Sequence, residues 1–455
     1  MSFQTVNHKR FFIHTLGCKV NQYESQVMRE MLLKAGYREC LSKDIADVYI
    51  LNTCTVTHHA DRESRRWVGL FHRANPKAKI VITGCYIEND SEGVSILPGV
   101  AHIIKNSDKG RVADILDGRL PAEASAKAGR KTKDERRERF DHLSITSFEG
   151  HTKAFVKIQD GCENSCSYCK VPLVRSAVRS KPVKFITEEV RTLVENGYKE
   201  IVLVGICLGA WGSDLFPGEI ARSVGMKGAV LVDALKAIDN IKGDFRIRLS
   251  SIEPRYVTDE LIGFMAKTRR MCRHLHIPLQ SGDDETLKVM NRPYTTADYK
   301  SLIEKARSGI KDVAITTDIL VGFPGETDER FHSTVNFVKE IIPARTHIFR
   351  FSKRKGTSAY EMADVVSNDV AKQRYMVLRT VTLIASCLYR SGFLGEKLDV
   401  LVESKRDKNS NLLTGYTDNY IRVLFKGPDE LMKKIAPVKI TDITLMQTLG
   451  EYDGT

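Results

Sequence analysis

The chain has 455 residues, a length that predicts roughly three domains of ordinary size. Its hydrophobic content of 42% and charged content of 28% are typical of a folded protein and exclude a disordered chain. We find no apolar run of about 18 residues and no apolar signal-peptide core, so we expect a cytoplasmic protein without a membrane partner. The net charge of +13 favours an acidic partner such as a nucleic acid, although a merely basic enzyme would carry the same charge.

The cysteine content favours metal chemistry or catalysis. A disulfide framework explains ten cysteines poorly in a chain that we expect in a reducing compartment. Thiolates bind zinc and iron and act as nucleophiles, so the positions of the cysteines along the predicted elements carry much of the functional information.

The first predicted domain, residues 9–118, alternates strand-like and helical segments, which predicts an open parallel α/β sheet. Its strand-like runs are FFIHTL (11–16), VYILNT (48–53) and KIVITG (79–84). A cysteine follows each run: Cys18, Cys54 and Cys85. Because ligands bind at the carboxyl ends of strands in such sheets, we expect these three cysteines to converge on one crevice.

Residues 119–150 are poor in large apolar side chains and rich in charge, which predicts a linker. Its basic run could touch a polyanion, but a solvated loop is the simpler interpretation.

A second alternating series, residues 151–385, predicts a central partial (βα)6 barrel with its active site at the carboxyl-terminal mouth of the strands. The strand candidates are AFVKIQD (154–160), EIVLVGI (200–206), FRIRLSS (245–251), HLHIPLQ (274–280), AITTDILVGF (314–323) and HIFRFS (347–352). Amphipathic stretches such as 187–197, 258–268 and 295–309 separate them.

The tail, residues 391–453, is different in character. Its short β-rich segments at 397–404, 412–427 and 438–450 are separated by turn signals and predict a small antiparallel β-barrel. Small barrels of this kind often bind nucleic acid.

Three further cysteines stand within eight residues, as Cys162-x₃-Cys166-x₂-Cys169. A structural zinc site requires four ligands, and Asp160 and Glu163 are indifferent substitutes for a fourth thiolate. Three thiolates on a cubane iron–sulfur cluster leave one iron open to an exogenous ligand. A zinc site or a redox pair is the minor alternative.

This cysteine spacing, directly after the first strand of a βα barrel, resembles the radical S-adenosylmethionine superfamily. The resemblance implies that the open iron binds the amino and carboxylate groups of S-adenosylmethionine. An electron from the cluster then cleaves the sulfonium and gives a 5′-deoxyadenosyl radical.

Other stretches resemble the methylthiotransferases of that superfamily over nearly the whole chain except the linker. HTLGCKVNQYES (14–25), NTCT (52–55) and TGCY (83–86) are similar to their N-terminal domain. RLSSIEP (248–254), HIPLQSGDDETLKVMNRPYT (276–295) and DILVGFPGET (318–327) are similar to their barrel, and TGYTDNYIRV (414–423) to their C-terminal TRAM domain. The branch that acts on N6-threonylcarbamoyladenosine in tRNA is the most similar.

The resemblance assigns Cys18, Cys54 and Cys85 to an auxiliary 4Fe-4S cluster whose open iron carries sulfur, so the expected cofactors are two 4Fe-4S clusters and S-adenosylmethionine. One S-adenosylmethionine methylates the sulfur, and another generates the radical that removes hydrogen from C2 of the adenine. The implied partners are the tRNA anticodon arm, a flavodoxin- or ferredoxin-like electron donor and a sulfur source. We expect a monomer.

Three alternatives remain open at this stage. Within the superfamily, the substrate could be isopentenyladenosine in tRNA or an aspartate of a ribosomal protein. From a different class of protein, the chain could be a non-catalytic iron–sulfur RNA-binding sensor.

Several residues around the barrel mouth are further candidates for cofactor binding. Tyr168 could pack near the adenine of the cofactor or simply pack within its loop. Gly205 and Gly209 would let the backbone approach the methionine part of the cofactor. Arg248 and Glu253 could bind its ribose or carboxylate, with a structural salt bridge as the alternative.

Gln280, together with His276, could line the cavity, with core hydrogen bonding as the alternative. The resemblance implies that the stretch with Gly322 and Gly325 shapes the cofactor pocket, where these glycines would permit the turn. Cys207 is expected to be a buried thiol and not a further cluster ligand. Other residues are given simpler roles: Lys353, Arg354 and Lys355 form a solvated basic loop that could meet RNA phosphates, and Cys40, Cys272 and Cys387 are packing residues.

Overall fold

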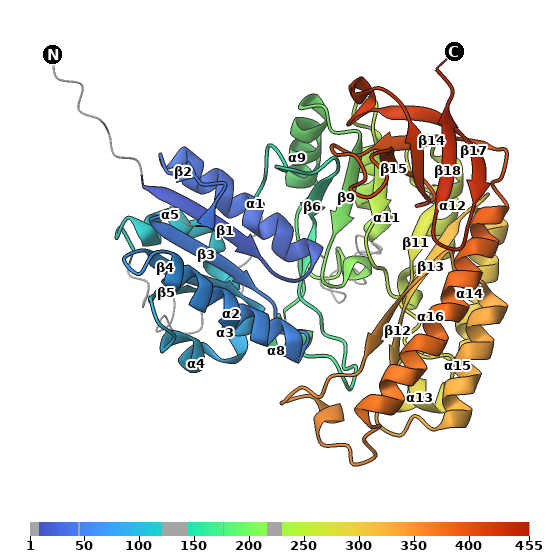
Figure 1. Cartoon of the computed structure of the whole chain (residues 1–455), viewed down its shortest axis with the longest axis horizontal. Helices are drawn as coiled ribbons and strands as arrows, with labels where there is room; N and C mark the ends of the chain where they lie inside the picture. Colours follow the sequence, from blue (N-terminus) through green and yellow to red (C-terminus); the bar gives the residue numbers. More distant parts are fainter. Residues whose placement is uncertain (1–8, 44–45, 121–142, 176, 216–229, 455) are drawn as a thin grey trace, which may run out of the picture.

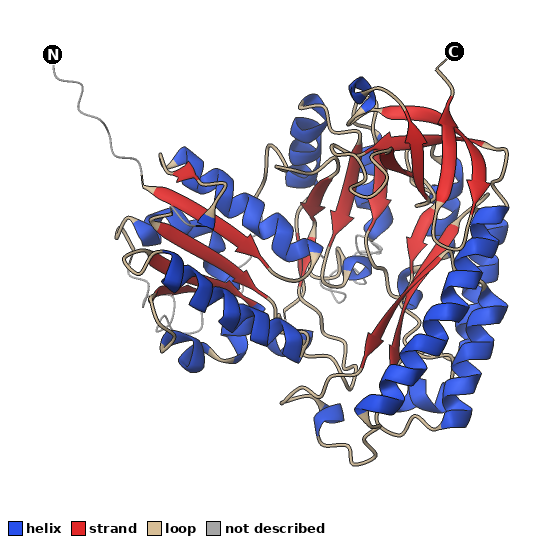
Figure 2. Ribbon diagram, viewed as in Figure 1, coloured by secondary structure: helices blue, strands red, loops and turns tan. Residues whose placement is uncertain are grey.

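The computed structural model of the chain describes residues 9–43, 46–120, 143–175, 177–215 and 230–454. Three sheet-based units follow one another along the chain, from the blue N-terminal sheet to the red C-terminal barrel (Figure 1). Helices cover the first two units, whereas the third consists mainly of strands (Figure 2). In these ranges we find no helix that is long and apolar enough to cross a membrane.

The N-terminal unit is a five-stranded parallel sheet of order β2-β1-β3-β4-β5. Its strands are β1 (Arg10–Thr15), β2 (Arg38–Glu39), β3 (Val48–Thr53), β4 (Lys79–Gly84) and β5 (Val100–Ile104). Its helices are α1 (Lys19–Lys34), α2 (His58–Ala74), α3 (Cys85–Asn89), α4 (Ser91–Ser95), the 3₁₀ helix η2 (Asn106–Arg111) and α5 (Val112–Leu116). The predicted open parallel sheet is confirmed.

Alternation along β3 explains why this sheet is covered on both faces. Val48 and Ile50 pack with α1 and α5 on one face, whereas Tyr49 and Leu51 pack with Phe71 of α2 on the other. Successive side chains of a strand point to opposite faces, so a strand buried on both sides is apolar throughout.

The central unit is an incomplete parallel barrel of six principal strands. These are β6 (Ala154–Lys157), β9 (Glu200–Val204), β10 (Arg246–Leu249), β11 (His274–His276), β12 (Ala314–Val321) and β13 (Arg345–Arg350). They form two parallel sheets, β10-β9-β6 and β11-β12-β13, joined by isolated bridges such as Ser251 to His276. A short antiparallel ribbon, β7 (Gln159–Asp160) with β8 (Arg179–Ser180), extends β6. The predicted (βα)6 barrel is confirmed.

Most helices of this unit cover the outside of the barrel. The helices are α8 (Val171–Val174), α9 (Val183–Glu195), α11 (Leu231–Asp239), α12 (Asp259–Lys267), α13 (Asp284–Val289), α14 (Thr296–Gly309), α15 (Asp328–Ile341) and α16 (Asn368–Ser391), with the 3₁₀ helices η3 (Leu208–Ala210), η4 (Pro254–Tyr256) and η5 (Ser358–Tyr360). Helix α8 instead lies against α3 of the N-terminal unit. Ile201, Leu203 and Ile247 of the strands belong to the same core as Val190 and Leu235 of the helices. The residues between them, such as Glu200 and Arg248, face the lumen.

The C-terminal unit is a closed five-stranded barrel of order β14-β15-β16-β18-β17. Its elements are β14 (Lys397–Val402), β15 (Leu413–Thr417), β16 (Arg422–Lys426), η6 (Asp429–Leu431), β17 (Ile435–Ile443) and β18 (Thr448–Tyr452). The predicted small barrel is therefore confirmed. One detail differs from the prediction, because β16 and β18 pair in parallel while the other pairs are antiparallel.

The end of the predicted linker is packed and not solvated. The hydroxyl of Tyr23 donates to the carbonyl of Leu143, and Ile145 and Phe148 belong to the main core. The backbone N–H of Thr146 donates to Glu30 of α1. Residues 143–150 thus hold α1 against the central barrel, whereas the basic run of the linker lies outside the described residues.

Candidate active site

The cysteines of the N-terminal unit stand at the carboxyl edge of its sheet. Cys18 is the N-cap of α1, Cys54 follows β3 directly, and Cys85 is the first residue of α3 after β4. Gly17 has a φ of +96°, and a Cβ at that position would lie 2.7 Å from the Cβ of Cys54. Only glycine therefore lets the loop that carries Cys18 approach Cys54 so closely.

The electrostatic environment of these three thiols is shared. Burial raises the pKa of Cys54 to about 12, and the neighbouring Cys85 and Cys18 add to this rise. The Cys18 thiol is exposed, yet the surrounding protein still raises its pKa. Neighbouring thiols of this kind suit a cationic centre, because metal coordination replaces their protons.

The second set of cysteines lies on a loop at the mouth of the central barrel. The N–H of Cys162 donates to the carbonyl of Arg175 at 2.9 Å, and the N–H of Cys169 donates to the carbonyl of Cys166 at 3.0 Å. Between them, the N–H of Ser167 donates to the carbonyl of Met290 at 3.0 Å. The loop is thus pinned to the barrel independently of any bound group.

Arg175 connects the two sets of cysteines. Its Nε donates to the sulfur of Cys85 at 3.4 Å, and its Nη1 donates to Asp160 and to Glu24 of α1, both at 2.8 Å. Burial would raise the pKa of Glu24, but Arg175, Lys109 and Lys157 hold it well below its ordinary value. Asp160 is therefore part of a buried ion network and not a substitute cluster ligand.

A second arginine reaches the barrel set. Nη1 of Arg292 donates to the sulfur of Cys166 at 3.1 Å, and its Nη2 pairs with Glu253. Glu253, predicted to bind the cofactor, is thus placed close to the cysteine loop. Sequence reasoning missed both Arg175 and Arg292, since neither lies in a cysteine motif.

Cys207 is a buried thiol, as expected, but it lies beside Cys162. The Nδ2 of Asn164 donates to the sulfur of Cys207 at 4.0 Å, and the N–H of Asn164 donates to the sulfur of Cys162 at 3.5 Å. A hydrogen bond from Cys207 lowers the pKa of Cys162 to about 7 and raises that of Cys207. Cys162 is therefore the barrel cysteine most readily ionised.

The predicted glycines allow close packing within the protein. A Cβ on Gly205 would lie 2.8 Å from Oε1 of Gln159, and one on Gly209 would lie 2.3 Å from the Tyr256 side chain. Gly322 has a φ of +74°, and a Cβ there would lie 2.7 Å from that of Ala371 in α16. These contacts explain why glycine stands at each position, and a role in cofactor binding stays a prediction.

Tyr168 and Gln280 occupy the same end of the barrel. Tyr168 packs edge to face on Phe323, with ring centroids 6.4 Å apart, so ordinary loop packing describes its contacts. Gln280 has a φ of +70°, an uncommon conformation for this residue, and its N–H donates to the carbonyl of Asp318 at 2.8 Å. Such backbone outliers often cluster at functional sites.

Arg248 lies away from the cysteines, contrary to the expected cofactor role. Its Nε donates to Glu200 at 2.7 Å, and its other donors reach the carbonyls of Thr417 and Asp418 in the C-terminal barrel. The ring of Tyr420 lies 4.9 Å from its guanidinium. The structural salt bridge, our alternative interpretation, is the arrangement observed.

Arg354 also differs from expectation, because it is buried and not part of a solvated basic loop. Its Nη2 donates to Asp61 at 2.6 Å and to Thr55, the neighbour of Cys54, at 2.8 Å. This contact joins the N-terminal sheet to the barrel at the level of the cysteines. Lys353 instead lies over the ring of Tyr360 at 5.6 Å.

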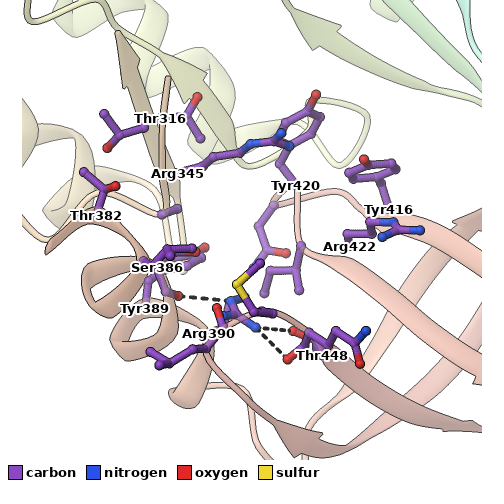
Figure 3. Close-up of a pocket in the computed structure, with 18 of the residues that line it drawn as sticks. Thr316, Arg345, Thr382, Ser386, Tyr389, Arg390, Tyr416, Tyr420, Arg422 and Thr448 are labelled. Carbon is purple, nitrogen blue, oxygen red and sulfur yellow. Dashed lines mark hydrogen bonds between the residues drawn. The ribbon is translucent and has the colours of Figure 1, made fainter. Parts of the chain in front are cut away.

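A cavity of about 460 Å³ separates the C-terminal barrel from β13 and α16 (Figure 3). Arg345 extends toward Tyr420 across its upper end, and Arg390 donates to Thr448 at 2.9 Å at its lower end. The cavity is polar and basic, with Tyr416 and Arg422 on its outer wall. It lies at the junction of the two barrels and not at the cysteines.

Both cysteine sets fit iron–sulfur clusters in their donor chemistry. Guanidinium groups donate to the sulfurs of Cys85 and Cys166, and such donors stabilise thiolate ligands. Among the described residues, no three or more His, Cys, Asp or Glu side chains are grouped so as to hold a single metal ion.

Comparison with known proteins identifies the family of the chain. Three family models match the chain: Uncharacterized protein family UPF0004 over residues 10–104, Radical SAM superfamily over 156–338 and TRAM domain over 393–449. The chain is 36% identical to the threonylcarbamoyladenosine tRNA methylthiotransferase MtaB of Bacillus subtilis, covering 96% of this chain and 95% of that protein. It is 38% identical to the MtaB of Thermotoga maritima, covering 91% of each. It is 34% identical to the tRNA-2-methylthio-N(6)-dimethylallyladenosine synthase of Clostridium tetani, covering 97% and 96%.

The chain belongs to the radical S-adenosylmethionine methylthiotransferase family. Membership confirms the predicted family and that the protein is an enzyme, and it implies a 4Fe-4S cluster and S-adenosylmethionine as cofactors. Among solved structures, the radical S-adenosylmethionine methyltransferase TsrM of Kitasatospora setae has a TM-score of 0.56 at 14% identity, covering 78% of this chain and 74% of that one. That likeness concerns the fold alone.

Proposed function

We propose that this methylthiotransferase inserts a methylthio group at C2 of N6-threonylcarbamoyladenosine next to the anticodon of tRNA. The observation that carries the proposal is the junction at Arg175, which contacts the sulfur of Cys85 while its carbonyl accepts from the N–H of Cys162. Two sets of thiolates held by one residue suit a reaction in which a radical and a sulfur donor meet at one carbon.

In this proposal Cys162, Cys166 and Cys169 hold the cluster that binds S-adenosylmethionine, and Cys18, Cys54 and Cys85 hold an auxiliary cluster. When bound, the first cluster with S-adenosylmethionine would supply a 5′-deoxyadenosyl radical. The auxiliary cluster would supply sulfur. The protein's own contribution is to orient both sites. Arg292 donates to Cys166, and Arg175 donates to Cys85, so each set has a fixed cationic neighbour.

Binding of RNA is assigned to the basic surface and the C-terminal barrel. The cavity beside that barrel offers cationic and aromatic groups, a combination that suits phosphates and stacked bases. A splayed-out base would then enter the central barrel. An external electron donor and a sulfur source complete the proposed reaction, and we propose that the enzyme acts as a monomer.

Dimethylallyladenosine, the isopentenyl-modified nucleoside, is the second candidate substrate. It is supported by the names of relatives at 33–34% identity, whereas the relatives named for threonylcarbamoyladenosine are 35–38% identical. The small difference in identity favours the first substrate, and only the first carries a carboxylate.

The deciding experiment is mass spectrometry of nucleosides from tRNA carrying N6-threonylcarbamoyladenosine. The cluster-reconstituted full chain is incubated anaerobically with this tRNA, reductant and S-adenosylmethionine. We expect the 2-methylthio derivative. If 5′-deoxyadenosine forms without that derivative, and tRNA carrying isopentenyladenosine is modified in a parallel reaction, the second candidate replaces the first. If neither tRNA is modified, a ribosomal-protein aspartate is tested next.

A further inference from the structure

The cavity of about 460 Å³ between the two barrels, called the junction cavity below, is separate from both cysteine sets (Figure 3). Three parts of the chain form its wall: the amino ends of β12 and β13, the carboxyl-terminal half of α16, and the strands and turns of the C-terminal barrel. Sites for small ligands typically have volumes of about 300–1,000 Å³. The junction cavity is therefore large enough to hold a ligand of that size.

The wall of the junction cavity carries positive charge. Arg345, Arg390 and Arg422 line it, and none of the described residues that line it is an aspartate or a glutamate. Arg422 is neutralised from outside the cavity by Asp407, at 2.6 Å. Arg390 has no carboxylate partner within the described ranges and donates to uncharged acceptors such as the hydroxyl of Thr448. An anionic group in the cavity would balance this charge.

Arg345 is the cation best placed to bind such a group. The described part of the chain gives its side chain no ion pair and no hydrogen bond, and the residue is exposed. Figure 3 shows it extending across the upper end of the cavity toward the ring of Tyr420. A planar guanidinium donates two parallel hydrogen bonds to a phosphate, so Arg345 suits a phosphate at the rim of the cavity.

Hydroxyl groups and tyrosine rings complete the lining. Thr346 of β13 lines the cavity, and its Oγ1 is buried without a hydrogen-bond partner among the described residues. Buried hydroxyls are usually paired, so an unpaired one on a cavity wall indicates that a polar group binds there. Ser386 of α16 and the side chains of Tyr416 and Tyr420 also line the cavity. Hydroxyls, aromatic rings and a guanidinium are together the groups that recognise a nucleotide.

The strand that begins at the junction cavity leads toward the cysteines. β13 is the edge strand of the sheet β11-β12-β13, and its exposed residues Arg345 and Phe349 lie on the same face because four residues separate them. This separation corresponds to about 13 Å. Just beyond β13, the hydroxyl of Ser352 accepts from the N–H of His58, which follows Cys54 closely in the chain. An extended RNA strand can therefore contact the cavity with one nucleotide and reach the cysteines with another.

We propose that the junction cavity binds one nucleotide of the RNA other than the nucleotide that is modified, with Arg345 on its phosphate. This inference rests on the proposed function, because it takes RNA as the partner. The site would hold the RNA at a second point, so that two contacts place the reacting base. A free nucleotide has the same chemistry as one unit of RNA, and the experiment distinguishes the two sources.

The test measures binding of an anticodon stem-loop RNA carrying N6-threonylcarbamoyladenosine to the cluster-reconstituted full chain, by fluorescence anisotropy at several salt concentrations. Arg345→Gln removes the free charge, and Ser386→Trp fills the cavity without changing its charge. The matched controls are Lys339→Gln, an exposed cation of α15 outside the cavity, and Leu388→Trp, an exposed position of α16. Iron content and thermal unfolding are measured for each protein.

We expect Arg345→Gln to weaken RNA binding about 10-fold at low salt, and to lower the slope of log Kd against log salt concentration by about 0.7–0.9, the value for one phosphate contact. Arg345→Lys should keep the slope. Ser386→Trp should weaken binding by a similar factor, and both controls should bind as wild type does. An Arg345→Gln protein with the affinity and salt slope of wild type overturns the inference, even if Ser386→Trp does not fold.

A second measurement identifies the source of the nucleotide. The loop nucleotides are replaced one at a time by abasic residues, and binding is compared between wild type and Ser386→Trp. We expect one abasic position, other than the modified nucleotide, to weaken binding to wild type without further weakening binding to Ser386→Trp. If no position behaves in this way while adenosine monophosphate binds wild type and not Ser386→Trp, the cavity takes a free nucleotide and the inference is wrong.

Formation of the 2-methylthio product is measured with the same preparations. A wild-type enzyme that modifies the stem-loop, but whose RNA binding is unaffected by the cavity variants, overturns the inference while the proposed function stands. A wild-type enzyme that binds the stem-loop through the cavity but modifies only RNA carrying dimethylallyladenosine refutes the proposed substrate and supports the nucleotide site. A wild-type enzyme that binds neither RNA refutes both.

Discussion

Arg175 of the central barrel donates a hydrogen bond from Nε to the sulfur of Cys85 in the N-terminal sheet, over 3.4 Å. Its remaining donors hold Glu24 and Asp160, one from each unit. This buried guanidinium, together with Arg354, therefore helps to fix how the two cysteine sets face each other. The planar guanidinium group of arginine suits this task, because it can donate hydrogen bonds to two carboxylates and a sulfur at once.

Replacing Arg175 by Gln should be severely destabilising. Glu24 and Asp160 would each lose one cationic partner while Lys157 still pairs with both, so the cost in the free energy of unfolding should reach about 3 kcal/mol. Urea unfolding of the anaerobic protein measures this loss, and nucleoside mass spectrometry measures the accompanying loss of transfer. Arg66→Gln, which removes an exposed pair with Glu63, is the control and should leave both unchanged. Equal stability of the Arg175 variant and wild type would refute the role given to this residue.

Cys166→Ala should abolish formation of 5′-deoxyadenosine. With only two thiolates left, the barrel set no longer holds the cluster that cleaves S-adenosylmethionine. Chromatography of the deoxyadenosine product and iron analysis check the result, with the iron of the N-terminal set expected to remain. Cys272→Ala, a buried cysteine outside both sets, is the matched control and should retain activity. Normal deoxyadenosine formation by the Cys166 variant would contradict the mechanism.

Cys54→Ala should separate the two halves of the reaction. The variant should still cleave S-adenosylmethionine, because the barrel cysteines are intact, but should give no methylthio product, because the sulfur-carrying set is incomplete. Both products are measured in one incubation, with Cys40→Ala of the same unit as the control. A fully active Cys54 variant would exclude the auxiliary site.

Glu200→Gln should weaken the junction between the two barrels in a pH-dependent way. Burial would raise the pKa of Glu200, but Arg248, Lys153 and Arg246 hold it well below its ordinary value of 4.5. A carboxyl group with a lowered folded pKa stabilises the protein fully above its unfolded pKa, and this contribution is lost as the pH falls through the folded value. The variant should therefore be less stable than wild type at pH 7, with the difference shrinking below about pH 4.5.

Thermal unfolding of wild type and Glu200→Gln across this pH range measures that difference. The control is Glu260→Gln, since Glu260 forms an exposed pair with Lys236 and its removal should change little at any pH. A difference between Glu200→Gln and wild type that stays constant from pH 7 down to about pH 2 would show that the charge of Glu200 is not the cause.

The strands and both cysteine sets could be predicted from the sequence because each depends on a local pattern. Periodicity marks the strands, and a cysteine that follows a strand must lie at the carboxyl edge of a parallel sheet. Arg248 and Arg354 could not be placed in this way. Their partners lie 169 and 293 residues away in the chain, in Thr417 and Asp61, and no local pattern relates the two ends of such a contact.

The same limit applies to Arg175 and Arg292. Arg175 lies just outside the cysteine motif, and Arg292 lies within the stretch 276–295, where nothing local relates it to a cysteine; each contacts a sulfur only in the folded chain. The sequence indicates that glycine is needed at positions 205 and 209, but the neighbours that require it there are side chains of the protein. Long-range pairing, and not the local sequence, therefore accounts for most of what the sequence could not predict.

The buried junction between the central and C-terminal barrels has a mechanical consequence. Arg246 and Arg248 donate to backbone carbonyls of the C-terminal barrel, and Arg273 clamps Asp418 at 2.6 Å, so the two barrels cannot swing independently. Any RNA gripped by the C-terminal barrel is thus held at a fixed reach from the cysteines. The distance between the RNA-binding barrel and the cysteines would therefore help to select the nucleotide that reacts. Its position along the RNA would matter as well as its chemistry.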